Sequence, residues 1–136
     1  SRTGIDMKGG TIIVGGRTGT LSGFMMQRGR MIILGDAGPN LGDSMYDGTI
    51  YVGGNINSLG VDAVLGEMTE LEASWIENKL TLYGLKAPNG AENLSLVDQV
   101  MHMLVHHAQV PLTSSLIVAL IVVLALVLGK RLKKML

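Results

Sequence analysis

The stretch that decides the fold is GGTIIVGG at residues 9–16, which recurs as RGRMIILG at residues 28–35 and as DGTIYVGG at residues 47–54. The three copies follow one another at a spacing of 19 residues. A repeat of short, fixed period is typical of units that stack on one another, because none of them buries its apolar face alone.

Each copy holds four or five strand-forming residues between glycines, which is enough for one β-strand and too short for a helix. The glycine-rich residues that follow supply sharp turns. We therefore predict an all-β solenoid, a right-handed parallel β-helix with rungs of about 19 residues over residues 1–64. Stacking in register predicts inward ladders, and these are Ile12, Met31 and Ile50, and Val14, Ile33 and Val52. The residues between them, Ile13, Ile32 and Tyr51, face outward under a further cover.

Residues 1–8 resemble the end of a further rung whose beginning is missing, which suggests an incomplete N-terminus or a rung supplied from elsewhere. An open end of this kind exposes unpaired backbone N–H and C=O groups, so we expect either a partner chain or preceding residues to cover it. The glycines Gly15, Gly16, Gly19 and Gly23 match neither a dinucleotide nor a phosphate-loop fingerprint, and the repeat explains them better.

These copies, together with GDAGPNLGDSM at residues 35–45, resemble the GXGXG domain. That domain is found at the C-terminus of the glutamate synthase large subunit, in stand-alone glutamate synthase-like subunits and in one of the subunits of formylmethanofuran dehydrogenase. The likeness covers about residues 4–85. It implies a scaffold without catalytic or cofactor-binding residues of its own, in a complex whose flavin and iron–sulfur clusters belong to larger partner subunits.

Composition limits the chemistry of the chain. The 136 residues include no cysteine, so the chain supplies no thiolate for an iron–sulfur cluster or zinc. A formal net charge of zero, with one Trp and one Phe, argues against a nucleic-acid partner. The only clustered carboxylates are Asp36, Asp43 and Asp47, and no His or Lys lies in register with them for acid–base catalysis. Charged residues at the turns, such as Arg17, Arg28 and Arg30, are interpreted as solvated surface, with docking contacts as the alternative.

After the repeat, residues 65–85 are predicted to form a capping segment. Thr69 and Glu72 have the spacing of a capping box, which starts a helix over about residues 70–83 and places Trp75 against the last rung. Residues 86–95 are expected to be a linker.

Residues 96–109 have apolar positions at helical spacing and are predicted to form an amphipathic helix. Its polar face carries Asp98, His102 and His106, which are weak candidates for a metal site because a third firm ligand is lacking. A solvated helix face is the favoured interpretation.

Residues 112–128 carry no charge and lead into a basic tail at 130–136. This pattern predicts a single transmembrane helix over residues 111–129, with a buried helix in a complex as the alternative. The expected membrane anchor consists of Leu116, Ile117, Leu120, Ile121, Leu124, Leu128, Lys130 and Arg131. The basic tail favours a cytoplasmic C-terminus, whereas the resemblance favours a cytoplasmic β-helix domain, and we adopt the second orientation.

Several functions are compatible with the sequence. The preferred one is a non-catalytic scaffold and anchor subunit of a membrane-associated, glutamate synthase-like oxidoreductase complex, with larger flavin or iron–sulfur proteins and membrane lipid as partners. The alternatives are a formylmethanofuran dehydrogenase-like structural subunit, or an assembly subunit of an unrelated membrane complex that shares only the fold. A catalytic role for the acidic cluster is a further alternative of a different class.

Overall fold

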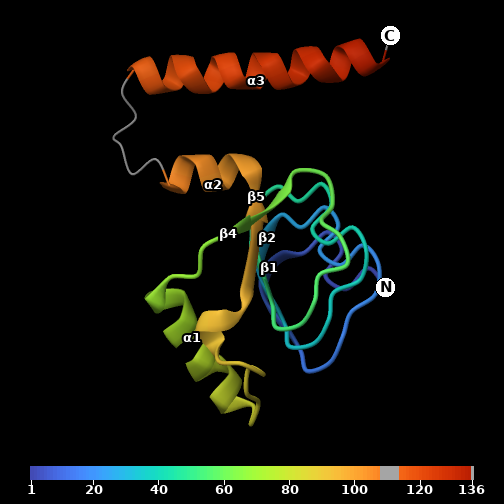
Figure 1. The fold of residues 1–136 in the computed structure, drawn as a ribbon, viewed down its shortest axis with the longest axis vertical. Coiled ribbons are helices and arrows are strands. Elements are labelled where there is room, and N and C mark those ends of the chain that lie inside the picture. The colour runs from blue at the N-terminus through green and yellow to red at the C-terminus, as the bar shows by residue number, and fades with distance from the viewer. Residues whose placement is uncertain (108–113, 136) are drawn as a thin grey trace. The chain divides into compact units, whose positions relative to one another are not determined.

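The fold is described from a computed structural model (Figure 1). It describes the backbone of residues 1–107 and 114–135, and the side chains of residues 1–102, 104 and 119–135. The chain divides into two units, residues 1–105 and 106–136, and each is described by itself.

The first unit is built on one sheet of five strands (Figure 1). In chain order these are β1 (Lys8–Val14), β2 (Arg28–Ile33), β3 (Thr49–Val52), β4 (Ala63–Gly66) and β5 (Ser95–Gln99). The order across the sheet is β1-β2-β3-β5-β4. The first three strands are parallel, whereas β5 runs antiparallel to both β3 and β4. The sheet is therefore mixed and open, with β1 and β4 at its edges.

The prediction of an all-β parallel β-helix is wrong. The described strands form one open mixed sheet, and the direction of β5 breaks the parallel order after β3. The reason is that the 19-residue period reports only the spacing between β1, β2 and β3. The strand that pairs with β3 on its other side comes from more than forty residues further along the chain, where no repeat indicates it.

The predicted register of the three parallel strands is confirmed. Ile12 pairs with Met31 and Met31 with Ile50, and the next inward ladder runs through Ile33. The connections between strands also bond at the repeat spacing, since the amide of Gly35 donates to the Gly16 carbonyl at 2.9 Å. The inward ladder residues of β2 and β3 form the larger part of the core, together with Met26, Leu41, Met45 and Val97.

The outward face of the sheet is covered by α1 (Glu70–Leu82). Ile76 and Leu80 of this helix pack with Ile32 and Tyr51, which are completely buried. The predicted cover of this face is thus confirmed, but the cover lies across the strands instead of sealing the end of the repeat. The capping box is also confirmed, since the Glu72 amide donates to the Thr69 hydroxyl oxygen at 3.2 Å.

Two polar contacts fix α1 on the sheet. The Tyr51 hydroxyl donates to Oε1 of Glu72 at 3.1 Å. Burial raises the pKa of that hydroxyl, and the neighbouring Glu72 carboxylate raises it further. The Arg30 guanidinium lies 4.2 Å from the centre of the Trp75 ring, which is a cation–π contact.

The segment after α1 differs from its prediction. A short 3-10 helix (Ala91–Asn93) leads into β5, and α2 begins only at Val100 and runs to His107. Residues 96–99 are therefore extended, not helical as predicted. Leu96 and Val97 pair with Tyr51 and Ile50 of β3, so the need of β3 for a second neighbour overrides the helical spacing of the apolar residues.

The second unit contains α3 (Ser114–Met135). Within residues 1–107 and 114–135, none of the helices combines the length and the apolar character that a membrane span requires. The prediction of a transmembrane helix is corrected accordingly. The helix begins at Ser114 and reaches its first charge at Lys130, so its uncharged part is about 24 Å long against a hydrocarbon core of about 30 Å. The predicted membrane location depended on that transmembrane helix and is corrected with it. The side chains of Leu116 and Ile117 are outside those that the structure describes.

Candidate interaction site

One edge of the sheet in the first unit is formed by β1 and, within the described residues, is free on its outer side. In the part of the chain that the structure describes, β1 has one neighbour, β2, so its other side carries unpaired backbone groups. Ile12, Ile13 and Val14 are only half-buried, whereas their partners in β2 are completely buried. A further strand on this side would bury the exposed part of these side chains.

Glycine geometry distinguishes this edge from the interior of the sheet. A Cβ added at Gly35 would lie 2.7 Å from the Gly16 carbonyl oxygen, and one added at Gly54 would lie 2.7 Å from the Gly35 carbonyl carbon. Each of these glycines is needed because the preceding copy of the repeat packs its backbone against it. Gly16 is the equivalent residue in the first copy, and a Cβ there would meet nothing within 4 Å. Among the residues that the structure describes, no backbone therefore packs against Gly16.

A hollow of about 330 Å³ lies beside the same edge, on the outward face. Thr11 and Ile13 of β1 form one wall, and Lys79, Tyr83 and Leu85 form the other. The hollow marks the place where the cover provided by α1 ends, since the partners of Ile13 in β2 and β3 are completely buried beneath that helix. Tyr83 remains 65 % exposed there.

The charge of the edge is mainly positive. Arg2, Lys8 and Arg17 are exposed on either side of the first copy of the repeat, against one carboxylate, Asp6. That carboxylate accepts a hydrogen bond from Nε2 of Gln27 at 2.6 Å. Lys8 pairs in the sheet with another cation, Arg28. An acidic group beside Lys8 would therefore relieve a repulsion between like charges.

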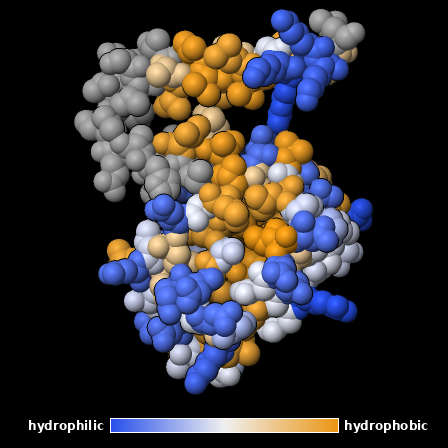
Figure 2. Space-filling view, in the orientation of Figure 1, coloured by the Kyte–Doolittle hydropathy of each residue, from blue (hydrophilic) through white to orange (hydrophobic). Residues whose placement is uncertain are grey.

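The opposite edge of the sheet has a different character. Figure 2 shows hydrophobic residues gathered on the first unit where β4, β5 and the start of α2 lie, and the exposed side chains there include Val61, Leu65 and Leu104. The edge strand β4 has only four residues and is followed by the charged Glu67. A very short edge strand is one way in which proteins discourage further pairing.

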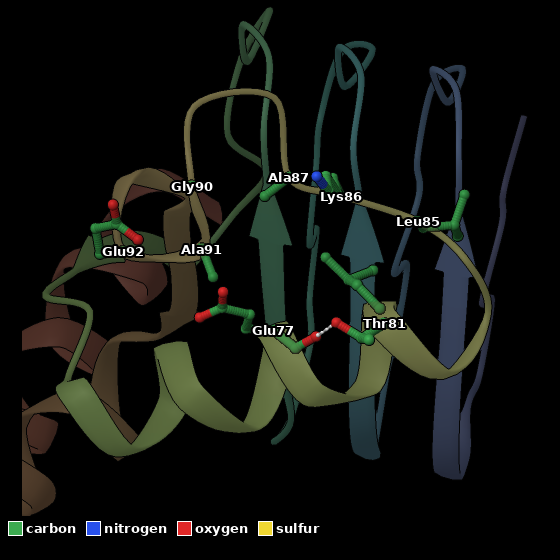
Figure 3. Close-up of a pocket in the computed structure, with 9 residues that line it drawn as sticks. Glu77, Thr81, Leu85, Lys86, Ala87, Gly90, Ala91 and Glu92 are labelled. Carbon is green, nitrogen blue, oxygen red and sulfur yellow. Dashed lines mark hydrogen bonds between the residues drawn. The ribbon is translucent and has the colours of Figure 1, made fainter.

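A second hollow, of about 320 Å³, lies between α1 and the segment that follows it (Figure 3). Leu80, Leu85, Ala87 and Ala91 supply apolar walls, and the rim carries Glu77, Thr81, Lys86 and Glu92. The Thr81 hydroxyl donates to the Glu77 backbone carbonyl at 2.8 Å, so it is engaged within its own helix. Figure 3 also shows α1 lying across the three parallel strands, with Leu85 near β1.

Of the three candidate metal ligands, Asp98 and His102 have side chains that the structure describes. Nδ1 of His102 lies 3.0 Å from Oδ2 of Asp98, and its Nε2 lies 3.6 Å from Oδ1 of Asp47. The pKa of His102 is raised, and the largest cause is the hydrogen bond with Asp98. Partial burial lowers this pKa, whereas the negative charges of Asp98 and Asp47 raise it further. Among the described residues no group of three ligating side chains is placed to hold a metal ion, and the side chain of His106 lies outside them.

Three acidic residues of the repeat accept hydrogen bonds from backbone amides in the turns. Oδ1 of Asp36 accepts from the Asn55 amide at 2.8 Å, Oδ2 of Asp43 from the Val61 amide at 3.2 Å, and Oδ1 of Asp47 from the Gly48 amide at 2.7 Å. These bonds join neighbouring copies of the repeat or close a turn within one copy. They give each carboxylate a structural partner.

The open end of the repeat is predictable from the sequence, whereas the hollow beside it is not. The sequence signal for the open edge is that the first copy keeps the glycine pattern of the later copies.

Comparisons with known protein families, with curated proteins and with solved structures found no match.

Proposed function

We propose that this chain is a non-catalytic structural subunit that docks on a larger subunit of a glutamate synthase-like oxidoreductase complex. The observation that carries the proposal is the free edge of β1, where Gly16 keeps open the space for a neighbouring backbone. A long edge strand with half-buried apolar side chains is a ready template for pairing with another chain.

The arrangement of the charged groups favours docking over catalysis. Asp36, Asp43 and Asp47 accept hydrogen bonds from backbone amides, and Asp98 of β5 holds His102 of α2. Catalytic groups instead converge on a space that a substrate can enter. The two hollows of the first unit are lined by other residues.

The resemblance of the repeat to the GXGXG domain is what suggests the class of complex. Under this proposal iron–sulfur clusters belong to the larger subunit, because the chain has no cysteine to ligate a cluster, and the resemblance implies that flavin belongs there too. The chain would contribute a rigid surface that positions the redox subunit.

Affinity purification of the tagged chain from its native cells tests the proposal. The bound proteins are identified by mass spectrometry, and flavin and iron are assayed in the same eluate. We expect stoichiometric recovery of a flavin- or iron–sulfur-bearing subunit. Recovery of the chain without any redox protein would contradict the proposal, and recovery with the catalytic subunits of a formylmethanofuran dehydrogenase would replace the glutamate synthase-like complex with that alternative.

A further inference from the structure

We infer that the free edge of β1 takes up an extended acidic strand of the partner, lying parallel to β1 and in the register of the repeat. The inference rests on the proposed docking function and adds the chemistry and direction of the segment that binds. Three independent features of the first unit carry it.

The first feature is the direction in which the glycines face. The position of the missing Cβ of Gly35 is filled by the backbone of the first copy, and that of Gly54 by the backbone of the second. In both cases the missing Cβ faces the strand that precedes the glycine in the sheet. At Gly16 the same direction leads away from β1, past the edge of the sheet. A partner strand that lies parallel to β1, in the register that β1 has with β2, would place its backbone against Gly16 in the way that the Gly16 backbone lies against Gly35.

The second feature is charge. The exposed charges that flank the first copy are Arg2, Lys8 and Arg17 against Asp6, whose carboxylate already accepts a hydrogen bond from Gln27. Next to Lys8 in the sheet lies Arg28, so no acidic group of β2 offsets it. A strand with a carboxylate near Lys8 is complementary to this edge, whereas a basic strand is repelled.

The third feature is the hollow formed by Thr11, Ile13, Lys79, Tyr83 and Leu85. Side chains of a strand alternate between the two faces of the sheet, so those of an added strand on the outward face would point into this hollow. Its apolar surface comes from Ile13, Leu85 and the ring of Tyr83, and its polar groups are those of Thr11, Lys79 and the Tyr83 hydroxyl. The bound strand therefore carries an apolar residue on that face.

A second copy of this chain fits the edge poorly. Two copies of β1 paired edge to edge in antiparallel fashion would bring Lys8 of each copy toward the region of Arg17 of the other, which places like charges together. Pairing β1 with β4 of another copy would use a strand of only four residues. A partner strand of opposite charge satisfies the edge better.

A peptide with the sequence DGTIYVGGN, copied from residues 47–55, is a suitable probe. It has the glycine pattern of the repeat, an aromatic outward residue (its tyrosine) and a single acidic charge. The matched control is KGTIYVGGN, in which the aspartate is replaced by lysine. Binding of each capped, fluorescently labelled peptide to the full 136-residue chain is measured by anisotropy. We expect saturable binding of the acidic peptide and binding of the basic peptide that is weaker by roughly three- to tenfold.

Two variants of the chain locate the binding. Gly16→Val is expected to abolish binding and to leave the fold intact, because its side chain enters only the vacant space. Gly129→Ala in α3, another position where an added Cβ meets nothing within 4 Å, is the matched control and should bind as the parent does. Lys8→Glu should reverse the preference between the two peptides. Circular dichroism verifies that each variant is folded.

The outcomes separate the inference from the proposed function. Absence of saturable binding up to millimolar peptide, equal binding of both peptides, or unchanged binding by Gly16→Val would overturn the acidic-strand inference. A dimer in sedimentation analysis that Gly16→Val dissociates would also overturn it, in favour of a second copy. Charge-selective peptide binding without recovery of a redox subunit from cells would uphold the inference and refute the proposed complex.

Discussion

Two alanine substitutions at equivalent glycines are predicted to have opposite effects on stability. Gly35 and Gly16 occupy the same position in successive copies of the repeat. At Gly35 an added Cβ lies 2.7 Å from the oxygen and 2.8 Å from the carbon of the Gly16 carbonyl, whereas at Gly16 it meets nothing within 4 Å. Neither glycine has the positive φ that would itself disfavour alanine.

The size of each effect follows from these distances. Relief of the overlap at Gly35 requires the backbone of one copy to move, which costs about 1–3 kcal/mol for overpacking. The same movement weakens the 2.9 Å bond from the Gly35 amide to the Gly16 carbonyl, which adds about 1 kcal/mol. Gly35→Ala should therefore lower the free energy of unfolding by about 2–4 kcal/mol. Gly16→Ala should raise it by about 0.4–1 kcal/mol, because alanine restricts the unfolded chain more than glycine does.

Urea denaturation followed by the fluorescence of Trp75, the single tryptophan of the chain, measures both effects. Trp75 reports the attachment of α1 to the sheet through its contact with Arg30. The thermal midpoint of Gly35→Ala should fall by on the order of 10 °C, and that of Gly16→Ala should stay level or rise. Equal loss of stability in the two variants would refute the assignment of Gly16 to a vacant edge.

Three further predictions concern α1 and His102. Thr69→Ala removes the capping box and should lower the free energy of unfolding by about 1 kcal/mol in urea denaturation, and Thr69→Ser should restore most of it. Tyr51→Phe removes the hydroxyl that donates to Glu72 and should cost about 1 kcal/mol; no change would mean that the bond does not hold α1 on the sheet. The folded-state pKa of His102 lies above the ordinary 6.5, so its stabilising contribution is complete below that pH and is lost as pH rises through the folded-state value. His102→Gln should therefore reduce the difference in urea midpoint between about pH 5.5 and about pH 8.5, and an unchanged difference would exclude His102 as its source.

The sequence predicted those parts of the fold that depend on local spacing. The register of β1, β2 and β3 follows from glycines and β-branched residues 19 residues apart, because equivalent side chains stack when the copies stack. The start of α1 follows from Thr69 and Glu72, since the capping box is made within four residues.

The parts that failed depend on contacts between distant segments. Leu96 and Val97 have the spacing of a helix with the apolar residues after them, yet they form β5, because β3 would otherwise have no neighbour on that side. Predicting the open mixed sheet would require knowledge of where β5 returns, which the spacing of the repeat does not contain. The hollow beside β1 likewise joins Ile13 to Tyr83, seventy residues apart, and no local pattern connects them.

Hydrogen exchange at the amides of β1 tests the central claim most directly. Exchange is compared between the isolated chain and the complex recovered from cells, with the amides of the buried strand β3 as an internal reference. Docking at the free edge predicts that amides of residues 8–16 that exchange rapidly in the isolated chain become strongly protected in the complex. Unchanged exchange along β1, with new protection confined to another surface, would contradict the account.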